Sequence, residues 1–467
     1  MLKYLRTWLP ELALGTLLLF FAFRELGTFP AAWADDSLFM IIARSVAEGR
    51  GFSLPLLGED WHFPYILAVG PTLIGPVALA IKLFGFSVAV ARIPMALYVI
   101  GTAILFYIFT QRVAGRRDAR WATALLITLS AFVNTGKPVM GEVPGLFFLL
   151  LGLLCLLHEE KTVGKWSAFA GISFGLSVLT KLTYGLIYPA LILAWINAII
   201  RRDWCTVRRL TMTGILALII YVPWRFLEMQ SQAGLLGEFR FLFGESETTE
   251  ATPFLYLLTH QEILFRLPFL SYGVFLILGG IGLWKLRSRL PRPVGIVLAT
   301  LIALFTLYFL SSFGWYRHLL PAHILLLTFV PAGATALCRR RFAPLVLAAI
   351  ILLQGVWQWK HFGSSTSTEA AEAADFIQHE FADRDLIIQQ ADVFVRLEPN
   401  PHWLFLTAQK ISDRLPERFV GLDEKQLCMP ILRKLSEEEV TALADRTTQA
   451  VRRYYIIQPD PSNCSQP

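Results

Sequence analysis

The sequence predicts an all-α polytopic membrane domain of about eleven spanning helices, followed by a small C-terminal α/β domain outside the membrane. Hydrophobic residues make up 55% of the 467 residues and charged residues only 16%, where soluble domains average about 25% charged. The mean hydropathy is +0.54, and the charged residues gather near the C-terminus. These three observations exclude an ordinary water-soluble enzyme.

The charged residues divide the chain at about residue 360. Residues 360–467 hold 12 Lys and Arg against 17 Asp and Glu, whereas residues 1–359 hold 30 against 18. We therefore expect a membrane domain over 1–359, with its first outer loop at 30–93, and a soluble domain over 360–467. No soluble module carries the basic face that nucleic-acid binding needs, so the expected partner surface is the lipid bilayer.

Eleven apolar stretches approach the length of about 20 residues that a spanning helix needs. The first is expected to be an uncleaved anchor, because Arg24 and Glu25 separate its apolar core from the signal-peptidase-like sequence Ala32-Trp33-Ala34. A cleaved signal peptide is the alternative. The stretches are 9–28, 94–109, 121–135, 143–158, 166–182, 184–200, 210–224, 264–284, 294–313, 319–337 and 342–359.

Four basic clusters between these stretches predict the orientation. They fall on one side of the membrane if the eleven helices alternate, and by the positive-inside rule that side is cytoplasmic. The N-terminus is then cytoplasmic and the C-terminal domain extracytoplasmic. The clusters are Arg112, Arg116, Arg117 and Arg120; Arg201, Arg202, Arg208 and Arg209; Lys285, Arg287, Arg289 and Arg292; and Arg339, Arg340 and Arg341.

The apolar stretch 64–86 cannot be a further span, because it would place the first two basic clusters on opposite sides. It contains three prolines and three glycines, which break a regular span more readily than they build one. We expect an in-plane or re-entrant helix here, within the first outer loop.

Two helix-to-strand patterns predict the α/β nature of the C-terminal domain. Residues 369–381 have helical spacing and lead into an apolar strand at 385–389, and residues 437–451 lead into 454–457 in the same way. Cys428 and Cys464 both lie in this outer part. A disulfide between them is predicted on equal terms with the alternative that the two do not pair.

The first carboxylates after the first expected span are Asp35 and Asp36. Two adjacent carboxylates at a membrane surface repel each other, so one is expected to be partnered or to bind a cation. The simpler interpretation is a helix N-cap, since Asp-Asp-Ser precedes the amphipathic stretch 38–48. The two roles can coexist.

Few other charged residues are expected at the outer ends of the spans. Glu142 lies between the third and fourth spans, Lys181 at the end of the fifth, and Tyr316-Arg317 at the start of the tenth. A Glu at a helix start matches the helix dipole, and cations at helix ends can be snorkelling anchors. Cations on the outer face also suit a lipid phosphate. Arg240 lies in an aromatic-rich stretch that is typical of an interfacial belt.

Five short motifs follow one another along about residues 30–325. They are Asp35-Asp36 followed by Ala43, Gly49 and Gly51-Phe52; Gly70-Pro71-Thr-Leu with Lys82-Leu-Phe84-Gly85 and Ala91-Arg92; Gly175-Leu-Ser-Val-Leu-Thr180-Lys181; Tyr221-Val-Pro223-Trp224; and Arg317-His-Leu-Leu-Pro321. Together they resemble the membrane-embedded glycosyltransferases of the C superfamily, in particular the protein O-mannosyltransferase and aminoarabinose-transferase-like branch.

The resemblance implies an inverting transfer from a polyprenyl-phosphate-linked sugar to a hydroxyl acceptor, on the non-cytoplasmic face of a bacterial inner membrane. The acceptor would be a lipid-linked glycan, a lipopolysaccharide or a protein. The first residue of the acidic pair serves this family as general base, which corresponds to Asp35, with Asp36 as the second catalytic candidate. Because a lipid phosphate leaves readily, cations rather than a general acid must hold it. The implied substrate-binding residues are Glu142, Lys181, Arg240, Arg317 and Tyr316.

Some relatives in this family bind a divalent metal ion through an acidic residue and a histidine in outer loops. The candidates for such ligands here are Glu59, Asp60, His62 and His260, and their spacing in the sequence does not indicate which of them would bind the ion. The chain also departs from the family pattern, because Asp36 replaces the usual Glu and Asp60-Trp-His62-Phe-Pro64 stands where the family has Pro-Pro. A possible divalent ion is thus the sole cofactor expected.

Two other functions fit a polytopic membrane protein. A transporter or flippase predicts internal repeats and ionisable groups near the membrane midplane, whereas the charges here gather at the outer ends of spans. A polymerase or ligase for lipid-linked glycans would share the face and the lipid donor, and would differ in the size of its donor pocket.

Overall fold

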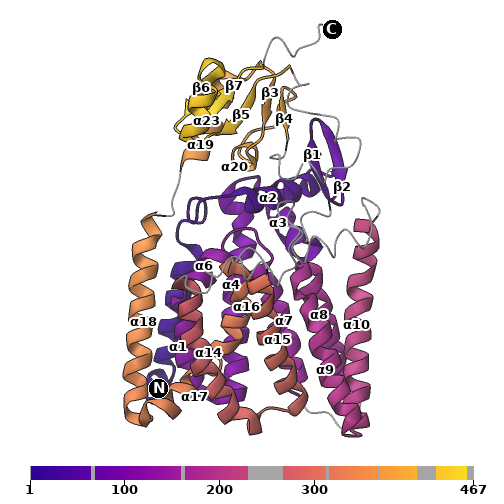
Figure 1. Cartoon of the computed structure of the whole chain (residues 1–467), viewed down its shortest axis with the longest axis vertical. Coiled ribbons are helices and arrows are strands. Elements are labelled where there is room, and N and C mark those ends of the chain that lie inside the picture. Colours follow the sequence, from indigo (N-terminus) through magenta and orange to yellow (C-terminus); the bar gives the residue numbers. More distant parts are fainter. Residues whose placement is uncertain are drawn as a thin grey trace.

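The computed structural model describes residues 2–64, 69–158, 164–229, 267–311, 315–364, 368–406 and 428–459. Long helices run side by side in one bundle, and a unit built on a β-sheet covers one end of it (Figure 1). This arrangement confirms the predicted class, a helical membrane domain with a small C-terminal α/β region. The end of the bundle under the sheet is called the sheet end below.

A helix lies in each of the eleven stretches predicted to span. Within the described residues, six of these helices are long and apolar enough to cross a membrane, or seven if α16 and α17, which are bent by 60° at their junction, form one span. The number of crossings therefore stays a prediction. The bundle helices are α1 (Leu2–Phe23), α4 (Val88–Ala114), α5 (Arg116–Thr128), α6 (Ser130–Gly136), α7 (Glu142–Leu156), α8 (Lys165–Thr180), η2 (Leu182–Leu186), α9 (Ile187–Ile200), α10 (Trp204–Met229), α14 (Leu267–Leu286), η3 (Arg287–Arg289), α15 (Arg292–Ser311), α16 (Tyr316–Leu327), α17 (Val330–Leu337) and α18 (Arg339–Ser364).

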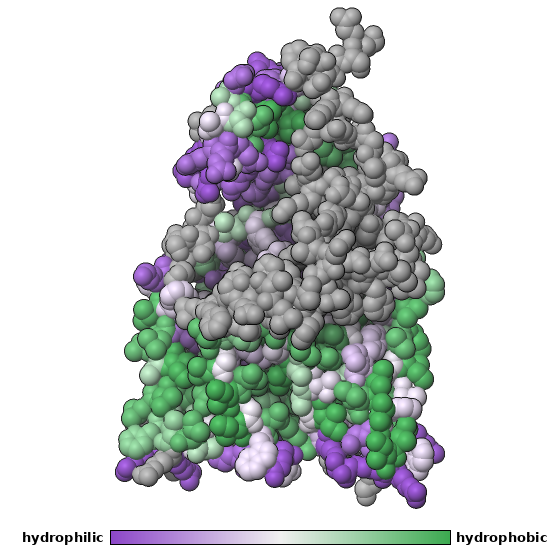
Figure 2. Space-filling model, viewed as in Figure 1, coloured by the Kyte–Doolittle hydropathy of each residue, from purple (hydrophilic) through white to green (hydrophobic). Residues whose placement is uncertain are grey.

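The bundle surface is that of an integral membrane protein. Figure 2 shows apolar residues over the sides of the helices and hydrophilic residues at the end away from the sheet. Small residues allow close helix packing, as is usual in membranes. A Cβ atom on Gly333 would lie 1.8 Å from the carbonyl oxygen of Leu278, and one on Gly282 would lie 1.9 Å from that of Phe329, so α14 and α17 approach at backbone distance.

The first outer segment folds over the sheet end of the bundle. It contains α2 (Ala34–Ala47), an antiparallel hairpin of β1 (Ser53–Leu56) and β2 (Glu59–His62), and α3 (Pro71–Phe84). At 1.5 Å per residue the 14 residues of α3 reach only about 21 Å, less than the thickness of a hydrocarbon core. Figure 1 shows α3 beside α2 at this end, consistent with the prediction that 64–86 does not span. Residues of α2, α3 and α4 share one apolar core with Trp61 of β2.

The C-terminal unit is a five-stranded mixed sheet in the order β4-β3-β5-β7-β6. Strand β3 pairs in parallel with β4 and β5, and the other pairs are antiparallel. Its elements are α19 (Glu369–Glu380), β3 (Leu386–Ile388), α20 (Ala391–Phe394), β4 (Trp403–Phe405), β5 (Ile431–Lys434), α23 (Glu437–Ala442), η5 (Ala444–Arg446), β6 (Thr447–Val451) and β7 (Tyr454–Ile457). The predictions for 369–381, 385–389 and 454–457 agree with α19, β3 and β7.

The predicted helix at 437–451 is wrong in its second half. The helix ends at Ala442, and Thr447–Val451 is strand β6, paired antiparallel with β7. The two threonines and the valine of this segment favour a strand. Arg452, whose φ is +50°, lies in the turn after which β7 runs back along β6. Cys428 is disulfide-bonded, whereas Cys155, Cys205 and Cys338 are not part of a disulfide. Cys464 lies outside the described residues, so its predicted pairing stays a prediction.

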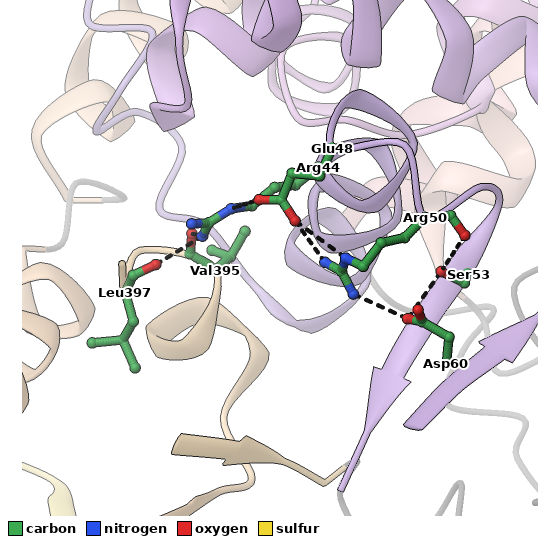
Figure 3. A network of polar contacts seen from close by, with 7 residues as sticks. All are labelled: Arg44, Glu48, Arg50, Ser53, Asp60, Val395 and Leu397. Atoms are coloured by element: carbon green, nitrogen blue, oxygen red, sulfur yellow. Dashed lines mark hydrogen bonds and ion pairs between the residues drawn. The ribbon is translucent and has the colours of Figure 1, made fainter. Parts of the chain in front are cut away.

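Polar contacts fasten the C-terminal unit to α2, as Figure 3 shows. The Arg44 guanidinium donates to the carbonyl oxygen of Leu397 at 2.7 Å and to that of Val395 at 3.5 Å, and its Nε donates to Glu48 at 2.9 Å. Arg50 continues the network by pairing with Glu48 and with Asp60 of the hairpin. The helix that begins with Asp35 and Asp36 is therefore held by the C-terminal unit as well as by the bundle.

Candidate active site

Four of the residues predicted from the sequence meet at the sheet end of the bundle. They are Asp35 in the first turn of α2, Glu142 at the start of α7, Lys181 at the end of α8 and Arg317 in the first turn of α16. Arg317 Nη1 lies 2.6 Å from Asp35 Oδ2, and its Nε lies 3.8 Å from Glu142 Oε1. Lys181 Nζ donates to the same Glu142 oxygen. These four residues are called the carboxylate–cation cluster below.

Charge alternates along this cluster, in the order Asp35, Arg317, Glu142, Lys181. The two carboxylates and two cations balance, so a bound phosphate would meet cations that already have partners. Asp35 is the most exposed of the four, since its side chain is 37% exposed, against 12% for Arg317, 11% for Lys181 and 4% for Glu142. Asp35 is thus the accessible end of a largely buried group.

Two indole rings border the Arg317 guanidinium. Its carbon Cζ lies 4.9 Å from the centre of the Trp33 ring and 4.3 Å from that of Trp315. Cation–π contacts of this kind hold a guanidinium over a flat apolar surface. Arg317 is therefore fixed between α2 and the start of α16, where its hydrogen-bonding edge faces the two carboxylates.

Backbone contacts fix the position of Lys181. An isolated antiparallel bridge pairs Lys181 with Val69, and the Thr180 and Thr72 hydroxyls lie 2.8 Å apart. On the other side Gly141 leaves room for the lysine, because a Cβ there would lie 2.8 Å from Lys181 Cβ. The segment before α3, the end of α8 and the start of α7 thus converge on this one side chain.

Gly141→Ala is expected to displace Lys181 and lower the rate of sugar transfer, with a loss of stability of about 1–3 kcal/mol from overpacking. The matched control is Gly75→Ala in α3, where no atom lies within 4 Å of the added Cβ. Thermal unfolding and transfer rates of the two purified variants check this. Equal behaviour of the two would show that the space beside Lys181 is not needed.

Asp36 lies beneath the cluster and is fully buried. Its Oδ2 accepts from Arg92 Nη2 at 2.5 Å, and its Oδ1 accepts from the Val139 N–H at 2.6 Å. The same Arg92 donates to the carbonyl oxygens of Leu26 and Pro30. The N-cap of α2 is Trp33, with no side-chain cap hydrogen bond, so the N-cap interpretation of the acidic pair is wrong. The expectation that one carboxylate is partnered is confirmed.

A second buried cation stands beside this ion pair. Lys137 donates to the carbonyl oxygen of Arg24 and lies 4.9 Å from the centre of the Phe29 ring. Burial lowers the pKa of Lys137 to about 7, and the nearby charge of Arg92 acts in the same direction. The turn that supplies the Val139 N–H to Asp36 is thus tied to the end of α1.

Among the described residues, the predicted site residues Tyr316 and Asp60 do not join the cluster. The hydroxyl of Tyr316 pairs with Nδ1 of His323, which lies nearly two turns further along α16 and is fully buried. Arg240 and His260 lie outside the described residues. Asp60 is bound by Arg50 at 3.0 Å and by the Ser53 hydroxyl at 3.1 Å.

Among the described residues the hairpin candidates form no three-ligand metal site, and His260 lies outside the described residues, so the expected divalent ion stays a prediction. Glu59, Asp60 and His62 lie on the single strand β2, where Asp60 and His62 share one face and Glu59 points to the other. Across the described part of the chain, no three His, Cys, Asp or Glu side chains gather closely enough to hold a metal ion. No step of the chemistry below is therefore assigned to a metal.

The sequence prediction missed the residues that position the site side chains by contacting them but do not themselves belong to the carboxylate–cation cluster. Arg92 carries a detectable signal, because an arginine inside an apolar helix is costly unless it has a buried partner. The same reasoning does not reveal Trp33, Trp315 or Thr72, whose side chains are ordinary at a membrane surface. Their roles depend on helix packing that the sequence does not state.

Known proteins resemble the chain in sequence and in fold. The family model described as dolichyl-phosphate-mannose-protein mannosyltransferase matches residues 76–226. An uncharacterized protein of Aquifex aeolicus is 29% identical over 194 residues, a match that covers 41% of this chain and 36% of that protein.

Two solved structures show the fold relationship. The crystal structure of ArnT from Cupriavidus metallidurans bound to undecaprenyl phosphate has a TM-score of 0.63 at 16% identity, covering 98% of this chain and 99% of that one. The archaeal oligosaccharyltransferase AglB from Archaeoglobus fulgidus, in complex with an inhibitory peptide and a dolichol phosphate, has a TM-score of 0.58 at 12% identity, covering 87% of this chain and 65% of that one. The chain thus shares its fold with these two structures, and the family model matches part of the segment over which the motif resemblance was predicted.

Proposed function

We propose that this chain is an inverting glycosyltransferase that moves a sugar from a polyprenyl-phosphate-linked donor to a hydroxyl acceptor on the non-cytoplasmic face of a bacterial inner membrane. The acceptor is a lipid-linked glycan, a lipopolysaccharide or a protein. One observation carries the proposal: an accessible carboxylate, Asp35, shares the Arg317 cation with the buried Glu142–Lys181 pair. The likeness to structures with bound lipid phosphates supports it.

The cluster supplies the two groups that this reaction needs. A hydroxyl nucleophile requires a carboxylate within hydrogen-bond reach, worth about 10²–10⁴ in rate, and Asp35 is the exposed carboxylate of the cluster. The phosphate leaving group requires cations in a water-poor site. Lys181 and Arg317 provide them, and Arg240 is a third candidate from the sequence.

The reaction is then a single displacement. The acceptor oxygen attacks the anomeric carbon while its proton passes to Asp35, and the bond from that carbon to the phosphate oxygen breaks. The electron pair of the broken bond leaves with the lipid phosphate, whose charge Lys181 and Arg317 hold. Base and leaving group lie on opposite sides of the sugar carbon, which inverts its configuration.

The Asp35–Arg317 ion pair gives the site a resting state. Without substrate, Arg317 holds the Asp35 side chain in place at 2.6 Å. A lipid phosphate competes for the same guanidinium, and this competition releases Asp35 to accept a proton from the acceptor. Donor binding thus prepares the base for the second substrate.

Surface glycans test the proposed function whatever the identity of the sugar. Mass spectrometry of lipid-linked glycans, lipopolysaccharide and glycoproteins should show one sugar missing from a deletion strain. Expression of the wild-type chain should restore that sugar, and expression of Asp35→Asn should not. An unchanged glycan profile in the deletion strain would overturn the proposal.

Lys181→Met is expected to raise the apparent KM for the lipid donor by about tenfold or more, because a charge-assisted contact to phosphate is worth about 1.5–3 kcal/mol. The single variant leaves Glu142 buried without its lysine, so the double variant Lys181→Met with Glu142→Gln separates binding from folding. The double variant should recover stability but keep the high KM. A wild-type KM in the double variant would remove Lys181 from the phosphate site.

A further inference from the structure

A basic pocket lies at the end of the bundle away from the carboxylate–cation cluster. Its lining comes from the last turn of α4, the end of α7 and the turn that joins α14 to α15, and its volume is about 400 Å³. The polar lining residues are Arg112, His158, Ser288 and Arg289, and Leu157 and Leu290 form apolar parts of the wall. Nothing in the proposed transfer reaction uses this pocket.

Helix α4 places the pocket at the opposite membrane surface. Arg92, which holds Asp36 under the candidate site, and Arg112, which lines the pocket, are 20 residues apart on this helix. At 1.5 Å per residue the separation is about 30 Å, which equals the thickness of a hydrocarbon core. The pocket therefore stands at headgroup level on the far side of the bilayer from Asp35.

The basic clusters at this end divide into paired and pocket-lining arginines. Arg116 and Arg120 of α5 both pair with Glu11 of α1, at 2.8 and 2.9 Å. Arg112 and Arg289 come from two different sequence clusters and meet in the pocket instead. The pocket thus combines cations that lie 177 positions apart in the sequence.

Hydrogen bonds hold cations at the pocket in place, and cationic side chains outnumber carboxylates around it. The Arg112 guanidinium donates to Nε2 of His158 at 2.7 Å, and Arg209 donates to the His158 carbonyl oxygen at 2.6 Å. The Asp118 carboxylate interacts with the charges of three cations, Arg289 among them. The balance at this corner is positive, which favours an anionic ligand.

Apolar surface adjoins the pocket on its membrane side. The His158 ring stacks on Trp166 with centroids 4.0 Å apart, and Phe169, 52% exposed, follows one turn along α8. Trp284, 67% exposed, lies on α14 just before the pocket-forming turn. A ligand with its phosphate between Arg112 and Arg289 would lay its acyl chains over these rings, whereas a soluble phosphate would leave them uncovered.

We infer that this pocket binds the phosphate headgroup of an anionic glycerophospholipid on the side of the membrane opposite the candidate active site. Two arginines and a serine hydroxyl supply the donors for phosphate oxygens, and the exposed aromatic rings supply the contact for the chains. The inference does not depend on the proposed glycosyltransferase activity. It gives the positive side of the bundle a specific lipid contact in addition to its role in orientation.

Native mass spectrometry of the full purified chain tests this inference, with phosphatidylglycerol and phosphatidylcholine titrated into a neutral detergent. Phosphatidylglycerol should bind more tightly than phosphatidylcholine to the wild type. The double variant Arg112→Gln with Arg289→Gln should weaken phosphatidylglycerol binding about tenfold or more, since each arginine near an anionic headgroup contributes about 1 kcal/mol. Arg112→Lys with Arg289→Lys should retain most of the affinity.

The matched control removes two exposed arginines of the same end, Arg201→Gln with Arg208→Gln, and should bind phosphatidylglycerol as the wild type does. An equal loss in this control would show that net charge alone attracts the lipid and would overturn the inference. Equal affinity for the two lipids would overturn it as well. Binding of glycerol phosphate as tight as that of phosphatidylglycerol would assign the pocket to a soluble phosphate and refute the lipid ligand.

Discussion

Asp35→Asn lowers the rate of sugar transfer by about 10²–10⁴, the contribution of a positioned general base, and leaves expression, membrane insertion and thermal stability close to wild type. The amide keeps the size of the side chain and its carbonyl oxygen can still accept from Arg317. It cannot take a proton from an acceptor hydroxyl at neutral pH. The side chain is 37% exposed, so its neutralisation strands no fully buried charge.

A second aspartate of the same outer segment provides the control for this variant. Asp60 also forms an ion pair with an arginine, Arg50, at 3.0 Å, but lies on the β-hairpin rather than in the carboxylate–cation cluster. Asp60→Asn should transfer sugar at nearly the wild-type rate. Near-wild-type transfer by Asp35→Asn, or an equal loss in the two variants, would mean that Asp35 is not the base.

Arg92→Met has the largest expected effect on stability. It leaves the fully buried Asp36 carboxylate without its ion-pair partner, and breaking such a pair from one side costs about 3–5 kcal/mol. The carbonyl oxygens of Leu26 and Pro30 also lose their donor. The apparent unfolding midpoint in detergent, followed by tryptophan fluorescence, should fall clearly below that of the wild type.

The double variant Arg92→Met with Asp36→Asn isolates the cause of this loss. Asparagine needs no counter-charge and its carbonyl oxygen can still accept from the Val139 N–H, so part of the stability should return. Arg50→Met is the surface control, because its ion pairs with Glu48 and Asp60 are about one-third exposed and such pairs contribute about 1 kcal/mol or less. A double variant less stable than Arg92→Met would contradict the ion-pair explanation.

Local sequence pattern was enough to locate the helices and the outer acidic pair. Apolar runs of sufficient length mark helices wherever they occur, so each predicted span contains one. The order of short motifs was enough to expect Asp35, Lys181 and Arg317 on one face. Their contact at the sheet end follows from the alternation of helix direction, which the basic clusters had already indicated.

The division of roles within the acidic pair could not be predicted. Asp36 is buried and Asp35 accessible because Arg92 and the Val139 N–H, 56 and 103 positions away, approach from one side only. The Val139 contact has no sequence signal, and although an arginine inside an apolar helix indicates a buried partner, the sequence does not say which carboxylate Arg92 binds. The contact between Glu142 and Lys181 could not be predicted from the sequence either. Nor could the position of Tyr316, because the adjacent Arg317 enters the site whereas the Tyr316 hydroxyl pairs with His323. The strand at Thr447–Val451 was missed because pairing with β7 outweighed the helical spacing.

Binding of undecaprenyl phosphate, a polyprenyl phosphate of the kind that the proposed transfer would release, tests the central claim most directly and applies whichever sugar is moved. The purified wild-type chain should bind this lipid in native mass spectrometry more tightly than it binds uncharged undecaprenol. Arg317→Gln should weaken the binding about tenfold or more, as the loss of a charge-assisted phosphate contact requires. Arg201→Gln with Arg208→Gln, at the opposite membrane surface, should bind as the wild type does. Equal binding of the two lipids, or unchanged binding by Arg317→Gln, would contradict the assignment of the carboxylate–cation cluster as a lipid-phosphate site.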